Sequence, residues 1–359
     1  MSSPASGPIE FAAFSSSART QNRSLSLDVL RIFATLWVLA FHLAQAYPEM
    51  FISTPVQLQQ FFLAGHYGVD LFFVLSGVVI ASSAVEKGAS RFALARFFRL
   101  APAYFVATIL ALALEFLTTK RIDPLELFAM TGLQFWTGGP YPVGPAWTLF
   151  VEASFYLLVF TGLKMRIFRI GNRFDVKKFL IYWIATSLIA HSLFPAFLDS
   201  IPLMKYLGCF SLGMTFSLIK SKADIKSNGL LLLASACLFG REIYLRLGAD
   251  LSLKLKAEAF IFLLLVAFCS LYFHVRSNND KLISPQWVTR IALMTYPLYL
   301  LHQNVAFPIA DFIVDWLAVS QTSAVAVAIV LIVGICYVQV SFLDMLGKKL
   351  LASIAKQKS

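Results

Sequence analysis

Charged residues are scarce in this chain. Only 14% of its 359 residues are charged, whereas 58% are hydrophobic. Soluble domains usually carry about 25% charged residues, so this shortage excludes an ordinary soluble domain. Because a helical membrane crossing needs about 20 mostly apolar residues, the chain has room for about ten crossings. We therefore expect no appended soluble catalytic domain.

Cysteine is also rare. The four cysteines all lie inside apolar runs, and none has CxxC spacing: Cys209, Cys237, Cys269 and Cys336. Buried thiols in helices mostly behave as small hydrophobic groups. The pattern argues against a disulfide framework and against a zinc site, and we expect no bound metal.

Acidic residues are outnumbered by basic ones, and the formal net charge is +11. The basic residues stand in short clusters between apolar runs, which is the arrangement that membrane topology requires. We therefore assign the positive charge to topology and expect no nucleic-acid partner.

Apolar segments recur along most of the chain. They lie at about residues 27–47, 66–84, 100–118, 147–163, 179–198, 203–219, 229–247, 258–274, 291–310 and 322–343. We predict an all-α, polytopic transmembrane helical bundle of about ten helices, with both termini in the cytoplasm. This domain would cover residues 25–345, between a flexible cytoplasmic tail (1–24) and a basic cytoplasmic tail (346–359). The first apolar run is too long for a cleaved signal peptide, so it predicts a retained helix.

The seventh segment is the weakest of the ten. Arg241, Glu242 and Arg246 interrupt it, so it is also compatible with a re-entrant or interfacial helix. With ten crossings, 22 lysines and arginines fall on the cytoplasmic side and 7 outside. Without the seventh crossing, the last two inner basic clusters would lie outside, against the positive-inside rule. We therefore retain it.

The first predicted helix carries Asp28, Arg31 and His42. Ionisable groups inside membrane spans are costly and are often functional. Arg31 and His42 are separated by about 16 Å along a helix and lie within about 20° of the same face. They therefore line one stripe, with Arg31 toward the cytoplasm and His42 toward the outside. The alternatives are that Arg31 pairs with Asp28 as a topology anchor and that His42 makes an interhelical hydrogen bond without chemistry.

Two carboxylates are predicted at a depth similar to that of His42. Asp70 begins the second helix and Glu152 the fourth, and by helical rise all three residues fall in the outer third of the membrane. A histidine near carboxylates suggests a base and its orienting partner. The alternative is that the acids only hold helices together.

Further polar residues mark the cytoplasmic side and the ninth segment. Arg96 and Arg99 share a helix face and could hold a phosphate-bearing ligand, or they could serve as positive-inside anchors. His302 is expected near the middle of the membrane, where Pro297 is predicted to kink the helix.

Five motifs in this order resemble the acyltransferase 3 family, which includes bacterial O-antigen and exopolysaccharide O-acetylases. They are Arg31…His42, GVDLFFVLSG at Gly68–Gly77, Arg96-x-x-Arg99 with Pro102 and Tyr104, PAWTLFVEASFY at Pro145–Tyr156, and TYPLYLLH at Thr295–His302. The resemblance covers about residues 25–345. Thr148 and Thr295 stand where serine is commoner in the family.

The resemblance implies an O-acetyltransferase, an acyltransferase that transfers groups other than amino-acyl groups. The donor would be acyl-CoA, usually acetyl-CoA, taken from the cytoplasm. The acceptor would be a glycan or glycolipid hydroxyl at the outer face of a bacterial inner membrane, and membrane lipid would surround the protein.

The resemblance and the predicted depths of the polar residues together assign roles to individual residues. His42 would be the acyl-transfer histidine, with Arg31 essential beside it and Glu152 and Asp70 in the catalytic group. The donor site would use Arg96, Arg99 and Tyr104, and the acceptor site Trp147, Tyr299 and His302. A neutral imidazole suits the removal of a proton from a sugar hydroxyl.

Two other classes of protein remain open at this point. One is a polytopic transporter or flippase without acyl-transfer chemistry, and the other is a catalytically silent structural membrane protein. Transporters of this kind are typically built from internal repeats with helices broken at the membrane midplane. The sequence has no recognisable internal repeat and only the expected kink at Pro297. The acceptor, the length of the acyl chain and the oligomeric state are not determined by the sequence.

Overall fold

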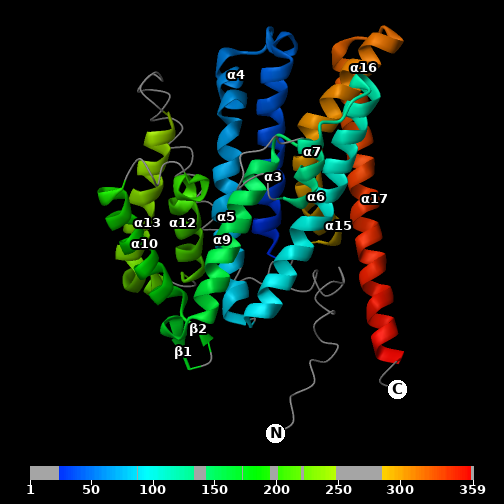
Figure 1. Cartoon of the computed structure of the whole chain (residues 1–359). Coiled ribbons are helices and arrows are strands. Elements are labelled where there is room, and N and C mark those ends of the chain that lie inside the picture. The colour runs from blue at the N-terminus through cyan, green and yellow to red at the C-terminus, as the bar shows by residue number, and fades with distance from the viewer. Residues whose placement is uncertain are drawn as a thin grey trace.

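The structure is a computed structural model that describes residues 24–86, 88–132, 143–171, 173–194, 201–219, 222–247 and 285–356. Its helices are α3 (Leu25–Ala46), α4 (Val56–Leu63), α5 (Gly68–Glu86), α6 (Ala89–Thr119), α7 (Pro124–Phe128), α9 (Ala146–Lys164), α10 (Val176–Leu193), α12 (Leu207–Ser217), α13 (Lys222–Leu247), α15 (Gln286–Leu301), α16 (Phe307–Leu317) and α17 (Gln321–Lys356). Helices α10, α12 and α13 lie on one side of α5 and α9, and α6, α15 and α17 lie on the other (Figure 1).

The predicted all-α fold class is confirmed. Within the described ranges, strand structure is confined to a small antiparallel hairpin between α9 and α10, formed by β1 (Arg169–Ile170) and β2 (Arg173–Phe174). Each predicted apolar segment overlaps a described helix, except residues 258–274, which lie outside the described residues. The predicted N-terminal tail, residues 1–24, also lies outside them except for Ser24. Residues 346–356, expected as a separate tail, instead continue α17 to Lys356.

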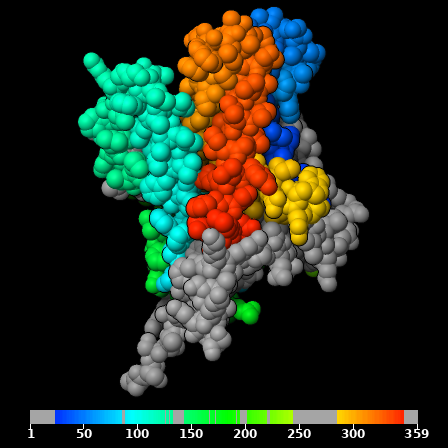
Figure 2. Space-filling view, turned by 90° about the vertical axis from the view of Figure 1, so that its right-hand side faces the viewer, coloured from blue at the N-terminus to red at the C-terminus, as the bar shows by residue number. Residues whose placement is uncertain are grey.

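Five helical segments in the described part of the chain are long and apolar enough to cross a membrane. They are Leu25–Ala46, Val56–Val85, Ala89–Thr119, Ala146–Lys164 and Gln321–Leu346. The last of these is the most exposed, and Figure 2 shows α17 along the surface of the molecule beside α6. Its Val330 and Val338 are 70% and 65% exposed. An apolar outer face on a long helix suits contact with lipid, so the protein is a membrane protein.

Helix α12 is the most deeply buried element. All its residues from Leu207 to Phe216 are buried. Its 11 residues span about 16 Å, roughly half of the hydrocarbon core, so the predicted segment 203–219 is not one full-length α-helix. The chain enters α12 through a 3₁₀ turn, η5 (Pro202–Tyr206).

Glycines allow α12 to pack closely against α5. A Cβ atom on Gly213 would lie 1.9 Å from the carbonyl oxygen of Val74, and one on Gly77 would lie 2.4 Å from that of Phe210. In a membrane, lipid removes the hydrophobic driving force for helix association. Small residues at a helix interface let the two backbones approach closely and gain van der Waals contact. Close α5–α12 packing therefore depends on these two residues.

The polar residues that seemed to interrupt the seventh segment lie inside a continuous helix, α13. Glu242 is buried, and both its carboxylate oxygens accept the backbone N–H of Gly208 at 2.8 Å. That N–H belongs to the first turn of α12, where the helix itself supplies no acceptor. Glu242 thus stabilises the start of α12 while remaining within α13.

The ninth segment changes helix type part-way along. Helix α15 continues through Pro297 to Leu301, and residues His302–Ala306 then form a π-helical turn, η6, before α16 begins. π-helical turns occur frequently at functional sites because they redirect side chains and free backbone groups. In this chain the turn starts at His302.

Candidate functional site

His42 and His302 lie against each other, although the sequence separates them by 260 residues. Nε2 of His302 is 3.0 Å from Nδ1 of His42, and the ring centroids are 4.9 Å apart. His302 is buried and His42 is half-buried. Two residues that the sequence analysis assigned to different roles therefore form one unit.

The hydrogen bonds of this pair define which nitrogens carry protons. Nδ1 of His302 is 2.7 Å from the carbonyl oxygen of Tyr299, and because a carbonyl only accepts, this nitrogen donates. Nε2 of a neutral His302 is then an acceptor. Nδ1 of His42 must donate, toward His302 and toward the carbonyl oxygen of Val38 at 3.1 Å. With both rings neutral, the network assigns an unprotonated Nε2 to His42.

The structure does not bring Asp70 or Glu152 to His42. Among the described residues, the hydrogen bonds of His42 go to Val38 and His302. Asp70 accepts from the thiol of Cys209 at 3.3 Å, in the α5–α12 interface. The expectation that a carboxylate orients the histidine is therefore not met, because helical rise gives a residue's depth but not the neighbour that its side chain faces.

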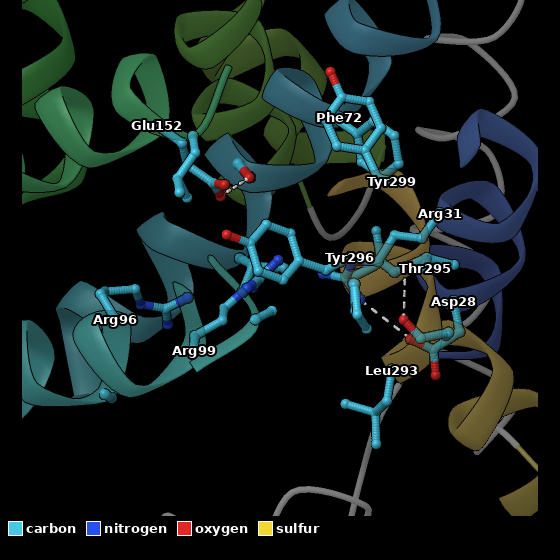
Figure 3. Close-up of a pocket in the computed structure, with 18 of the residues that line it drawn as sticks. Asp28, Arg31, Phe72, Arg96, Arg99, Glu152, Leu293, Thr295, Tyr296 and Tyr299 are labelled. Carbon is cyan, nitrogen blue, oxygen red and sulfur yellow. Dashed lines mark hydrogen bonds and ion pairs between the residues drawn. The ribbon is translucent and has the colours of Figure 1, made fainter. Parts of the chain in front are cut away.

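Glu152 belongs to a different place, a cavity of about 510 Å³ between α3, α5, α6, α9, α15 and α17. Its carboxylate accepts the hydroxyl groups of Ser76 and of Tyr156, the latter at 2.5 Å. Figure 3 shows the cavity with Arg96 and Arg99 on one side and the Asp28–Arg31 pair on the other. The volume is within the range of about 300–1,000 Å³ that is usual for small-molecule sites.

The two α6 arginines differ in how the protein holds them. The Arg96 guanidinium is buried, donates to the hydroxyl of Ser83 at 2.8 Å and lies 5.5 Å from the ring centroids of both Phe92 and Tyr156. Its Nε has no hydrogen-bond partner within the described residues. Arg99 lines the same cavity, and among the residues described the structure gives it no hydrogen bond or ion pair. Both side chains therefore have N–H groups available for an anionic ligand.

Arg31 also lines the cavity, but it is paired. Its Nη1 donates to Asp28 at 3.1 Å, and Asp28 accepts from Thr289 at 3.3 Å as well. The ion pair between Arg31 and Asp28 that the topology-anchor alternative requires is therefore present. The same arginine nevertheless faces the cavity, so the two interpretations of Arg31 are compatible.

Of the remaining predicted site residues, one lines the cavity and two lie outside its lining. Tyr299 lines the cavity, packs 5.7 Å from Phe72 between ring centroids and supplies the carbonyl that fixes His302. Tyr104 and Trp147 lie outside the lining. Tyr104 packs on Phe150 at 5.7 Å, and Trp147 packs on Tyr206 at 5.6 Å.

Two tyrosines at the site were missed by the sequence analysis: Tyr296, which lines the cavity, and Tyr156, which binds the cavity residue Glu152. Tyr156 follows Glu152 by one helical turn, so the spacing of four residues was a usable signal for their hydrogen bond. Tyr296 projects between the α6 arginines and the Asp28–Arg31 pair (Figure 3), and its hydroxyl donates to the carbonyl of Leu100 at 3.3 Å. Its position inside the TYPLYLLH motif was visible, but its partner on another helix was not.

Comparison with known proteins places this geometry in a family. The sequence model of the acyltransferase 3 family, described as an acyltransferase domain, matches residues 24–339. One curated relative is the peptidoglycan O-acetyltransferase OatA of Listeria monocytogenes, which is 29% identical over 157 residues; the match covers 37% of this chain and 23% of OatA. No solved structure matches. Because the family match includes most of the chain, this protein belongs to the acyltransferase 3 family and is an acyltransferase.

Proposed function

We propose that this protein is a multi-pass membrane O-acetyltransferase. It transfers an acetyl group from acetyl-CoA to a sugar hydroxyl of a surface polysaccharide, lipopolysaccharide, peptidoglycan or glycolipid. The observation that carries the proposal is the histidine pair, which leaves a lone pair on Nε2 of His42 in a bundle that also holds an arginine-lined cavity.

The cavity suits the donor. Coenzyme A is anionic, and the guanidinium groups of Arg96 and Arg99 have N–H groups without partners among the described residues. Guanidinium groups bind phosphate in a bidentate geometry, which an ammonium group cannot reproduce. Arg31 adds a third cation, partly neutralised by Asp28. We therefore assign donor binding to this cavity, with Tyr296 and Tyr299 on its wall.

The histidine pair suits the chemistry. Nε2 of His42 removes the proton of the sugar hydroxyl while the hydroxyl oxygen attacks the thioester carbonyl carbon. The carbon–sulfur bond then breaks, and the departing thiolate of coenzyme A takes the proton from the imidazolium of His42. His302 accepts the Nδ1 hydrogen of His42 throughout and so holds the ring in the reactive tautomer.

We further propose ten membrane crossings with both termini in the cytoplasm of a bacterium, in the inner membrane. The basic asymmetry of 22 to 7 supports this topology. The start of α3 and the end of α17 lie at the same end of the molecule in Figure 1, as an even number of crossings requires. Arg96 and Arg99 lie toward that end of α6, where a cytoplasmic donor would enter.

Reconstitution tests the proposal. The purified protein in liposomes should transfer label from radiolabelled acetyl-CoA to lipopolysaccharide, peptidoglycan fragments or glycolipid, forming an ester that mild base removes. His42→Ala, inserted to the same level, is the matched control and should form the ester at least about 100-fold more slowly. Glycan movement across the liposome membrane without new ester would support the transporter alternative and refute acetyl transfer.

A further inference from the structure

A second cavity, of about 380 Å³, is lined by Gln303 and Asn304, the two residues that follow His302 in the chain. It is bounded by the C-terminal part of α6, the π-helical turn η6 and the start of α16. Its lining residues are Ala111, Leu114, Glu115, Thr118, Gln303, Asn304, Phe307, Pro308 and Asp311. We call it the outer cavity, because it is lined by the C-terminal part of α6, whereas Arg96 and Arg99 lie in the N-terminal part of that helix.

Three contacts connect the outer cavity to the His42–His302 pair and to the cavity that holds Arg96 and Arg99, which we call the donor cavity. Gln303 follows His302 directly, and the ring of Phe307 lies 6.2 Å from that of His302 between centroids. Tyr299 lines the donor cavity and binds His302 through its carbonyl. Along this stretch of the chain, His302 therefore lies between Tyr299, which lines the donor cavity, and Gln303, which lines the outer cavity.

The lining chemistry of the outer cavity differs from that of the donor cavity. Two carboxylates, Glu115 and Asp311, line it, and its lining among the described residues contains no lysine, arginine or histidine. The Asn304 Oδ1 atom accepts the N–H of Gly144 at 2.7 Å. Within the described part of the chain, the Gln303 amide has no hydrogen-bond partner. Gln303, Asn304 and Glu115 are half-buried, whereas Asp311 is exposed. Half-buried amide and carboxylate groups next to an aromatic ring can bind several hydroxyls of one ligand.

We propose that the outer cavity is the acceptor site and that it binds an uncharged sugar through Gln303, Asn304 and Glu115. The described lining residues include no cation, which disfavours a phosphate or uronic-acid acceptor, because an anion there would face the carboxylates of Glu115 and Asp311. This inference rests on the proposed acetyl transfer, and it adds the place and the charge class of the acceptor. It also separates the substrates, with the anionic donor among arginines and the neutral acceptor among amides.

Kinetics with the intact protein provide the first test. Gln303→Leu removes the amide at nearly constant volume and should raise the KM for the acceptor sugar about tenfold, because a buried-site hydrogen bond is lost. The KM for acetyl-CoA should stay within about twofold of the wild-type value. Gln57→Leu, on the exposed face of α4, is the matched control and should change neither constant. A change in the donor constant with an unchanged acceptor constant would overturn the assignment.

A labelling experiment tests the site without turnover. Thr118→Cys places a thiol in the exposed wall of the outer cavity, and Ser53→Cys places one in the exposed turn before α4 as a control. Maltotetraose or chitotetraose should slow the reaction of Thr118→Cys with a membrane-impermeant maleimide, and should not slow that of Ser53→Cys. Tetragalacturonate, which is anionic, should protect neither.

The outcomes separate the two proposals. Protection by a neutral tetrasaccharide in a protein that transfers no acetyl group would support the outer cavity as a sugar site and refute the acetyl transfer. Acetyl transfer to a neutral sugar without protection of Thr118→Cys would place the acceptor elsewhere. Equal protection by tetragalacturonate would refute the charge class.

Discussion

Nε2 of His302 lies 3.0 Å from Nδ1 of His42, and the Tyr299 carbonyl fixes the other nitrogen of His302 at 2.7 Å. In the proposed reaction, this arrangement makes His302 a positioning residue for His42. In hydrolases a carboxylate commonly has this task, but a carboxylate is an anion and would be costly at this buried site. In a neutral histidine one ring nitrogen donates and the other accepts, so His302 can hold His42 in the same tautomer without adding a charge.

The role of His302 predicts a graded loss of activity. His302→Leu should lower kcat by about 10–100-fold, less than loss of the base itself, because the Val38 carbonyl still accepts from His42. The KM for acetyl-CoA should not change. His302→Gln should restore part of kcat, since an amide oxygen can accept the same hydrogen. Equal losses for Leu and Gln, tracking the amount of inserted protein, would indicate a purely structural residue.

The role of His42 predicts a larger loss. His42→Ala should reduce acetyl transfer by about 10²–10⁴-fold while expression and insertion stay normal, because general-base assistance is worth that much. The measurement is transfer per mole of inserted protein. A structural histidine would instead lower the protein level and the activity together. Wild-type turnover in the alanine variant would make His302 the better candidate for the base.

The proposed donor site predicts that a substitution there changes only the KM for acetyl-CoA. Arg99→Ala should raise the KM for acetyl-CoA about 10–100-fold, the value of a hydrogen bond to a charged group. Arg99 has no hydrogen-bond partner among the described residues, so its removal leaves no such partner unpaired. Arg91→Ala, also on α6 but outside the cavity lining, is the matched control. If both variants behave alike, Arg99 is only a topology anchor.

Much of the fold followed from the sequence because it depends on composition and periodicity. Apolar runs predicted the helices, and the helix around Arg96 and Arg99 put both side chains on one cavity wall, as their spacing of three residues indicated. The resemblance identified the family correctly. These successes concern properties that one helix carries alone.

The incorrect predictions concern contacts between two helices. The partner of His42 was sought among carboxylates at similar depth, but depth leaves the rotation of each helix undetermined, and the structure turns Asp70 toward Cys209. Glu242 seemed to interrupt a helix because its partner, the N–H of Gly208, lies on a neighbour 34 residues away. A polar residue in an apolar run shows that a partner exists without showing which helix supplies it.

The basic asymmetry predicts the topology of the C-terminus. A reporter that is active only outside the cytoplasm, fused after residue 359, should give no signal, because ten crossings return the chain to the cytoplasm. A cytoplasmic reporter at the same junction should be active. The opposite pair of results would mean an odd number of crossings. In that case α13 would be the first helix to examine, since it carries charged residues near both of its ends.

The α5–α12 interface predicts a large effect from a single methyl group. Gly213→Ala places a carbon 1.9 Å from the Val74 carbonyl oxygen, and backbone atoms cannot move aside as a flexible side chain does. We expect the free energy of unfolding to fall by about 1–3 kcal/mol or more, the usual cost of overpacking. Gly334→Ala, on α17, is the matched control, because its added carbon meets nothing within 4 Å and alanine favours a helix. The measurement is the midpoint of thermal unfolding in detergent, compared between the two variants. Equal midpoints would show that α12 does not pack on α5 at this distance. The contact between Asp70 and Cys209, which lies in the same interface, would then be wrong as well.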